Sequence, residues 1–337
     1  MKISGYANGS MKRTITAIAV GLLSVLIAVS AAAVPLKVLT YNLGLLRFVG
    51  FDFVPIVKAR AAVAPREIAR FALEQSPDII VLEEVWKNSY AVAITEALAP
   101  LGYDIVRPKG CAVAGKEGGL LVAAKQPLRI VSWSFTRFGR STFIDSLARK
   151  GVLAATVENP GAGGARFALF ATHTVALDTD RGTPVDQKQV AVVTKELRYV
   201  LSVIEQTSAA GSLPVLLVGD FNVGPRYVDE SYRVIADAPG IREAGAAAAP
   251  GDAFFTWDPG NPLVHYGGYP NEPAAKLDHV FTRDGGTARW RVLAAHVVFT
   301  RVVAGLAFVP SRGAAAVPTP LSDHYGFLAD LELESAR

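Results

Sequence analysis

The sequence is short of cysteine and of net charge. Its 337 residues include one cysteine, Cys111, so the chain cannot form an intramolecular disulfide or a cysteine-rich zinc site. We expect Cys111 to be a passive thiol. Lys2, Lys12 and Arg13 lie in an N-terminal segment without acids, and without this segment the formal net charge falls from +4 to +1. Such a nearly neutral body is not typical of a protein that coats DNA.

Apolar residues, in contrast, are plentiful. They make up 51% of the chain, which is enough for a large core and excludes overall disorder. No internal repeat stands out and no long linker divides the chain. We therefore expect residues 34–337 to form one domain.

The N-terminus has the pattern of a secretion signal. Lys12 and Arg13 precede an uncharged run over 14–36, and Ala31–Ala33 offer the small residues that signal peptidase prefers. We expect residues 1–33 to be a signal peptide and the mature chain to be secreted or periplasmic. The alternative is an uncleaved membrane anchor, because the run is just long enough to cross a bilayer.

From residue 36 onward, short aliphatic runs alternate with amphipathic helical stretches. Helical periodicity is clear at 64–76 and 185–206. The predicted strands are 36–43, 77–86, 118–125, 150–158, 166–174, 214–222, 276–283, 290–300 and 322–333. Because strands outnumber helices, the pattern favours an α/β fold with two packed mixed β-sheets flanked by helices, a four-layer α/β sandwich.

Polar residues recur at the ends of these strands. Singly, an asparagine or aspartate there usually serves a turn, and a lone histidine is more often structural. Their joint occurrence favours a site, because ligands in α/β folds collect where strand ends converge. The residues are Asn42, Glu84, His173, Asp220, Asn222, Asp278, Asp323 and His324.

This set suits magnesium-dependent attack of water on a phosphate ester. Mg²⁺ takes oxygen ligands and accepts one or two carboxylates, for which Glu84 and Asn42 are candidates. An imidazole oriented by a carboxylate can deprotonate water, and a second donor can stabilise charge on the phosphate. Histidine fits because its ordinary pKa is about 6.5.

Six motifs, TYN, LEEV, THT, GDFN, LDHVF and SDHY, follow one another across residues 40–325. In this order they resemble the endonuclease/exonuclease/phosphatase superfamily, which includes deoxyribonuclease-I-like nucleases, inositol polyphosphate 5-phosphatases and neutral sphingomyelinases. The resemblance covers almost all of the chain beyond the N-terminal segment. Each motif is a moderate match alone, and six in order are a strong one.

The resemblance implies that Asn42, Glu84 and Asp323 lie on the metal side, with Mg²⁺ or another divalent cation as cofactor. The residue before the metal glutamate is commonly glutamine or asparagine in the family, and here it is Glu83. This acid could tighten cation binding or face solvent on the alternate side of the strand. We expect Glu83 to face solvent.

The same resemblance assigns the reacting groups. Asp220 and Asn222 would position the nucleophile and the phosphate, and His173 would assist at the phosphate. His324 would be the catalytic base, oriented by Asp278.

Longer segments are similar to the sphingomyelinase branch. They include EEVWKNS at 83–89, the Lys-Gly pair at 150–151, and a Thr-Trp-Asp sequence whose downstream asparagine precedes the Leu-Asp-His strand. The resemblance implies that Asn88, Trp257 and Asp258 support the site or contact the substrate head group. The alternative for Trp257 is ordinary core packing.

Two apolar segments favour a membrane substrate independently. Segment 43–55 follows Asn42, and segment 302–310 lies just before the SDHY motif. We expect both at the rim of the site, with an exposed Leu306 and Phe308 dipping into a bilayer. The alternative is that these segments are ordinary core.

The leading hypothesis is a secreted, magnesium-dependent phosphodiesterase that acts on a phospholipid membrane surface and converts sphingomyelin to ceramide and phosphocholine. We expect a monomer without a dedicated nucleic-acid partner. The alternative enzyme is a secreted nuclease, or an inositol-phosphate or phospholipid phosphatase, on the same scaffold. A third hypothesis is a non-catalytic surface-binding protein. The sequence speaks against it, because every position expected of the metal and base residues is filled.

Overall fold

The computed structural model describes residue 1 and residues 33–48, 50–108, 118–139, 149–177, 185–207, 212–286 and 288–335. Residues Ala31–Arg337 form one compact unit. Cys111 and the expected signal peptide, apart from its first and last residues, lie outside the described residues. Among the described helices, none is both long and apolar enough to cross a membrane.

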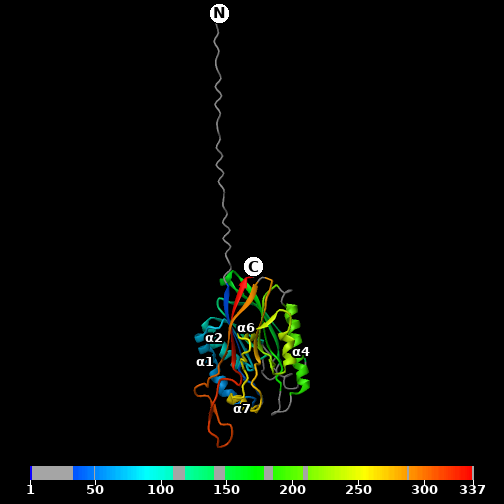
Figure 1. Ribbon diagram of the computed structural model, residues 1–337. Coiled ribbons are helices and arrows are strands. Elements are labelled where there is room, and N and C mark those ends of the chain that lie inside the picture. The colour runs from blue at the N-terminus through cyan, green and yellow to red at the C-terminus, as the bar shows by residue number, and fades with distance from the viewer. Residues whose placement is uncertain are drawn as a thin grey trace. The chain divides into compact units, whose positions relative to one another are not determined.

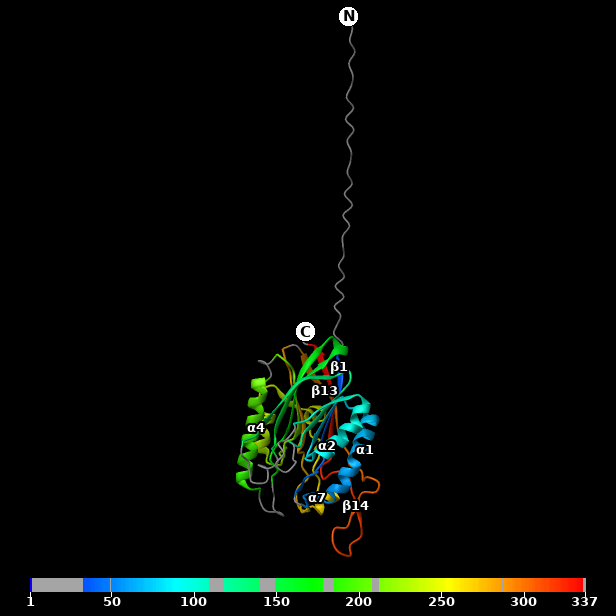
Figure 2. The same ribbon diagram turned by 180° about the vertical axis from the view of Figure 1, so that it is seen from behind.

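Two six-stranded mixed sheets pack against each other, as the sequence predicts (Figures 1 and 2). The first has the order β13-β16-β1-β4-β6-β5, formed by Ala288–Val298, Gly326–Ser335, Val34–Asn42, Ile79–Glu83, Leu121–Lys125 and Tyr103–Val106. The second has the order β11-β12-β10-β9-β8-β7, formed by Ile241–Glu243, Asp278–Arg283, Val215–Asp220, Ala165–His173, Gly151–Asn159 and Arg129–Arg137. Each sheet contains one parallel pair, β1–β4 or β9–β10.

Helices cover the outer faces of both sheets and complete the predicted four layers. Helices α1 (Val57–Gln75) and α2 (Asn88–Leu98) pack on the first sheet. Helices α4 (Gln187–Thr207) and α5 (Asp229–Ala236) pack on the second sheet. Helices α1 and α4 lie on opposite sides of the sandwich in Figures 1 and 2.

Shorter elements connect these layers. They are the 3₁₀ turns Ala99–Leu101 and Pro160–Ala162, the helices α6 (Ala244–Ala248) and α7 (Pro262–His265), and the two-residue strand pairs β2–β3 (Arg47–Phe48 with Phe51–Asp52) and β14–β15 (Ala307–Phe308 with Val317–Pro318). Helix α7 and β14 lie at the end of the sandwich opposite the C-terminus (Figures 1 and 2).

The central strands are buried on both faces. In β1, Val38 faces the core between the sheets, whereas Leu39 faces the core under the helices. In β4, Val81 and Leu82 divide in the same way. Because neither face meets water, such strands appear in the sequence as continuous aliphatic runs.

Helix α1 begins at Val57, earlier than predicted. Val57, Ala61, Ala64 and Ile68 form one buried face that continues through Pro65. Burial of this face therefore outweighs the helical hydrogen bond that the proline cannot donate.

Candidate active site

The polar residues at the strand ends gather at one edge of both sheets. Strands β1 and β4 end together, with Asn42 opposite Glu83, and β9 and β10 end together, with His173 opposite Asp220. Strand β12 runs antiparallel to β10 and begins with Asp278 opposite Asp220. Because the carboxyl ends of parallel strands meet at one edge, residues distant in sequence become neighbours here.

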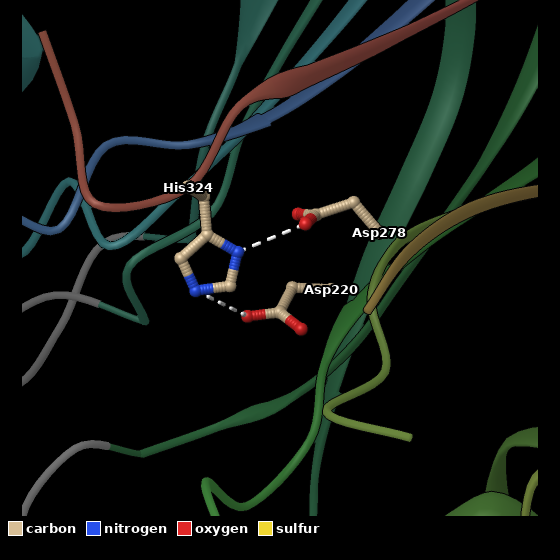
Figure 3. Close-up of side chains that lie close together, drawn as sticks. All are labelled: Asp220, Asp278 and His324. Carbon is tan, nitrogen blue, oxygen red and sulfur yellow. Dashed lines mark hydrogen bonds and ion pairs between the residues drawn. The ribbon is translucent and has the colours of Figure 1, made fainter. Parts of the chain in front are cut away.

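His324 lies between two buried aspartates (Figure 3). Its Nδ1 is 2.9 Å from Oδ2 of Asp278, and its Nε2 is 3.9 Å from Oδ2 of Asp220. Donation from Nδ1 to Asp278 orients the ring and directs Nε2 toward Asp220. Burial alone would lower the pKa of His324, but the charges of Asp278 and Asp220 raise it well above its usual value. Burial, aided by Asp278, raises the pKa of Asp220 to about 7.

The residues expected on the metal side lie beside His324 and Asp220. Asn42 donates from Nδ2 to Oδ2 of Asp220 over 2.8 Å, and its Oδ1 accepts the N–H of Gly44 over 2.9 Å. Burial raises the pKa of Glu84, and the charge of Asp323 raises it further. A Cβ on Gly44 would lie 2.3 Å from Oδ1 of Asp323, so only glycine fits at this turn.

The donor set fits a hard divalent cation. Carboxylates of Glu84, Asp220 and Asp323 line one pocket, where several buried like charges are costly unless a cation offsets them. Side-chain atoms of Asp220, Asp278 and His324 also lie within 4.8 Å of one another. Because Nδ1 of His324 is bonded to Asp278, the oxygen atoms of Glu84 and Asp323 suit a cation such as Mg²⁺ better.

His173 pairs with the buried Lys150, which stands out in the sequence only as part of a Lys-Gly pair. Nζ of Lys150 lies 3.1 Å from Nε2 of His173 and donates to the carbonyl of Thr174 over 2.7 Å. Burial, with the charges of Lys150 and His324, lowers the pKa of His173 well below its usual value. His173 is therefore a neutral imidazole, and Lys150 brings positive charge to a site rich in carboxylates.

Asn222 follows β10 with a left-handed backbone conformation, φ 52°, which asparagine tolerates. Its N–H donates to Oδ1 of Asp220 over 2.9 Å, and its Nδ2 donates to the carbonyl of Thr174 over 3.1 Å. These bonds hold Asn222 on the wall of the pocket.

The three residues expected to contact the head group or support the site lie in different places. Trp257 lines the pocket, and its ring centroid is 5.1 Å from that of His324. Asn88 begins α2 as an exposed residue and accepts a hydrogen bond from Arg107 over 2.6 Å. Asp258 accepts the N–H of Gly260 over 2.8 Å. Neither Asn88 nor Asp258 is among the residues that line this pocket.

The expectation that Leu306 and Phe308 are exposed is wrong. Leu306 is 3% exposed and packs in the core under α1, and Phe308 is 9% exposed and packs on Val54 and Leu263. The segment around β14 turns these two side chains inward, because the apolar surfaces of α1 and α7 lie beneath it.

The expectation that Glu83 faces solvent is also wrong. Its side chain is fully buried, and its Oε1 accepts the hydroxyl of Thr40 over 2.8 Å. Strand β4 has a sheet on one face and helices on the other, so no face of the strand reaches water. Burial raises the pKa of Glu83 well above its usual value, and Asp278 raises it further, which favours the protonated acid.

Sequence motifs did not identify Arg60, whose side chain holds two loops next to the site. Its guanidinium is fully buried and donates to the carbonyls of Leu43 over 2.7 Å, Gly44 over 2.5 Å and Leu321 over 3.2 Å. It thus joins the turn after Asn42 to the segment before the SDHY motif. Arg60 lies before the helix expected at 64–76, so its place on the buried face of α1 came only from the structure.

Thr256 of the Thr-Trp-Asp segment and the downstream Asn261 bond to the backbone beside Asp278 and His324. Oγ1 of Thr256 accepts the N–H groups of Leu277 and Asp278 over 3.0 and 3.1 Å. Nδ2 of Asn261 donates to the carbonyls of Ser322 and Asp323, each over 2.9 Å. The segment therefore fixes the two strands' ends that carry the dyad of His324 and its aspartate.

Comparison with known proteins finds one family. The model of the endonuclease/exonuclease/phosphatase family matches residues 39–324, which is most of the chain. No curated protein matches the sequence closely enough to count as a relative.

Several solved structures share the fold. Sphingomyelinase C from Streptomyces griseocarneus has a TM-score of 0.68 at 24% identity over 88% of this chain and 99% of that one. TDP2 from D. rerio, solved with a single-strand DNA product, has a TM-score of 0.62 at 16% identity over 88% and 98%. Mannosyl-6-phosphatase Bt3783 from Bacteroides thetaiotaomicron has a TM-score of 0.63 at 18% identity over 88% and 99%. At these identities the likeness establishes the fold and leaves the substrate open.

Proposed function

The chain belongs to the endonuclease/exonuclease/phosphatase family, and on that premise we propose that it is a magnesium-dependent phosphodiesterase that hydrolyses a phospholipid. The substrate we propose is sphingomyelin, and the products are ceramide and phosphocholine. The likeness to the sphingomyelinase from Streptomyces griseocarneus supports this choice.

The observation that carries the proposal is the arrangement of His324 between its two aspartates. Asp278 holds Nδ1, so Nε2 of the neutral imidazole can take a proton from a water molecule positioned by Asp220 and Asn222. The two aspartates that raise the pKa of His324 favour the imidazolium that forms. The oxygen of that water forms a bond to phosphorus, the bond from phosphorus to the ceramide oxygen breaks, and the ceramide oxygen takes up a proton from solvent to leave as the alcohol. Nε2 of His173 lies 3.5 Å from Oδ2 of Asp220 and 3.1 Å from the ammonium of Lys150, so we propose that His173 assists at the phosphate by positioning these two charged groups.

A divalent cation held by Asn42, Glu84 and Asp323 would supply positive charge that polarises the phosphate and offsets the carboxylates. Lys150 contributes a fixed positive charge from the protein itself, next to His173. We propose Mg²⁺ because the ligands are oxygen atoms.

An exposed apolar rim around the pocket supports a membrane substrate. Phe51 and Phe53 are 77% and 47% exposed, and Val302 and Val309 are 59% and 57% exposed. Phe53 also lines the pocket, so the rim is continuous with the site. We propose that these four residues, in place of Leu306 and Phe308, contact the lipid surface.

The positive charge of one rim segment also supports contact with a lipid surface. Residues 301–321 include the exposed Arg301 and Arg312 and no acid, which favours contact with phosphate head groups. From the N-terminal sequence we further propose that the protein is secreted or periplasmic, or held at the membrane by an uncleaved N-terminal segment. We propose a monomer that has no dedicated nucleic-acid partner.

The test is phosphocholine release from sphingomyelin vesicles, with Mg²⁺ and with a chelator, beside His324→Ala and a plasmid DNA control. Release that needs Mg²⁺ and that His324→Ala lacks, with intact DNA, is the expected result. Cut DNA and untouched lipid would keep the catalytic site and replace the substrate with a nucleic acid, as the likeness to a DNA-bound neighbour allows.

The rim has its own test. The double variant Phe51→Ser, Val309→Ser, at two exposed rim residues that do not line the pocket, should bind vesicles several-fold more weakly while hydrolysing a soluble phosphodiester normally. Leu73→Ser is the matched control, because Leu73 is 68% exposed in the last turn of α1, away from the rim. Equal loss on vesicles and on the soluble substrate would make the rim structural.

A further inference from the structure

One wall of the pocket combines aromatic rings with a buried carboxylate. The rings of Trp257 and Tyr269 pack edge to face with centroids 5.6 Å apart, and Nε1 of Trp257 donates to Oε2 of Glu272 over 2.9 Å. Glu272 is 9% exposed. All three residues line the same pocket as Asp220 and His324, so the wall lies within reach of the reacting phosphate.

Backbone pairing fixes this wall in place. The N–H of Trp257 donates to the carbonyl of Ala275 over 2.9 Å, and the N–H of Ala275 donates back over 2.8 Å. The ring of Trp257 also packs edge to face on His324. The wall is therefore built onto the catalytic base and formed before any ligand binds.

Aromatic rings beside a carboxylate suit one class of cation. A quaternary ammonium has no N–H to donate, so it is recognised by the faces of aromatic rings and by nearby negative charge. A phosphate needs the opposite surroundings, because a carboxylate repels it. The pocket thus divides into a side for the phosphate, at His324 and Asn222, and a side for a cation attached to that phosphate.

We propose that Trp257, Tyr269 and Glu272 form the subsite that binds the quaternary ammonium of a choline head group. This assignment rests on the proposed phosphodiesterase function and adds to it the residues that select the head group. The choline nitrogen lies two carbons from the phosphate ester, so both groups enter one pocket.

The experiment compares two soluble phosphodiesters, p-nitrophenyl phosphorylcholine and bis(p-nitrophenyl) phosphate. Glu272→Gln keeps an oxygen that can accept from Trp257 and removes only the charge. Tyr269→Leu removes the aromatic ring together with its hydroxyl and keeps an apolar side chain. Each should lower kcat/KM for the choline substrate by about tenfold, mainly through KM. Hydrolysis of bis(p-nitrophenyl) phosphate should stay within about twofold. Glu96→Gln, on the exposed side of α2, is the matched control.

The outcomes separate this inference from the function on which it rests. Equal loss on both substrates, in both variants, would make the wall a packing feature and overturn the subsite while leaving a phosphodiesterase. Failure of the unaltered protein to hydrolyse either diester with Mg²⁺ would overturn the proposed function and the subsite together.

Two lipids carry this head group, sphingomyelin and phosphatidylcholine. Phosphocholine release from vesicles of each lipid shows which is the source, and phosphatidylethanolamine vesicles serve as the comparison without the quaternary group. Faster turnover of either choline lipid than of phosphatidylethanolamine supports the subsite, and equal turnover of all three overturns it.

Discussion

Two clusters of mostly buried charged side chains differ in how their charges are balanced. The catalytic cluster comprises Glu84, Asp220, Asp278, Asp323, Lys150, His173 and His324. Acids outnumber bases in it, and burial raises the pKa values of Glu84 and Asp220. Its like charges are held together by the surrounding fold rather than by one another.

The second cluster, Lys276 with Glu243 and His279, is compensated. Nζ of Lys276 donates to Oε1 of Glu243 over 2.6 Å and lies 3.7 Å from the ring centroid of Phe327. Nε2 of His279 is 3.0 Å from the carbonyl of Val223 and 3.1 Å from that of Lys276. Burial would raise the pKa of Glu243, but Lys276 and His279 hold it at about 2.

The pairing of Glu243 with Lys276 stabilises the charged form of one partner more than that of the other. The carboxylate is stabilised, whereas burial lowers the pKa of Lys276 more than Glu243 raises it. The net worth of a buried pair is therefore small, although removing one partner strands the other. The difference between the clusters is that the charges of the second offset one another, whereas the acidic charges of the first line the pocket where we propose that a cation and a substrate bind.

The largest effect should come from breaking the compensated pair. Lys276→Met leaves Glu243 buried without its ammonium and should cost about 3–5 kcal/mol of unfolding free energy in denaturant titration. Adding Glu243→Gln should recover part of that loss. A cost below about 1 kcal/mol would show that water reaches the pair and that the contrast between the clusters is wrong.

The catalytic cluster should respond in activity instead. His324→Ala should reduce turnover by about a hundredfold or more, because the base is lost. The free energy of unfolding should also fall, because Asp278 and Asp220 lose the buried imidazole that offsets their charge. Near-normal turnover on a soluble phosphodiester would remove His324 from the role of base.

The next largest effect should be the loss of stability at low pH that comes from Glu243 in the second cluster. Because the pKa of Glu243 is about 2 in the folded protein and near 4.5 in the unfolded chain, its contribution is present above pH 4.5 and is lost as pH falls toward 2. Denaturant titrations should show about 2 kcal/mol less of this contribution at pH 3 than at pH 6. The Glu243→Gln, Lys276→Met double variant should lack this part of the acid sensitivity, and identical pH dependence of the two proteins would contradict the assignment.

The smallest effect concerns the cation. Glu84→Gln should raise the Mg²⁺ concentration for half-maximal activity by about tenfold, because a ligand charge is lost. Without Mg²⁺ the variant should be no less stable than the unaltered protein, since one buried like charge is gone. An unchanged Mg²⁺ requirement, with Glu96→Gln as control, would argue against Glu84 as a ligand.

The sequence predicted the layers because their physical cause is local. A strand such as β4 is covered on both faces and therefore appears as an aliphatic run, and α4 shows its apolar stripe directly. The strand-end residues were found because motifs at strand ends converge. Their roles in catalysis stay predictions.

The failures have a common cause in contacts between distant parts of the chain. Glu83 was expected in solvent because an isolated strand has an open face, and the second sheet covers it. Leu306 and Phe308 were expected outside because apolar content does not tell which side chains turn inward. Arg60 reaches Leu321 across 261 positions of sequence, and no local pattern reports such a bond.

The pairing of β1 with β16 also sets when, during synthesis, the candidate site can form. Strand β1 lies between β4 and β16, and Asn42 at its end meets residues just ahead of β16. During synthesis Asn42 emerges early, whereas His324, the proposed base, emerges only much later. The candidate site can therefore assemble only after the segment that pairs as β16 has been made.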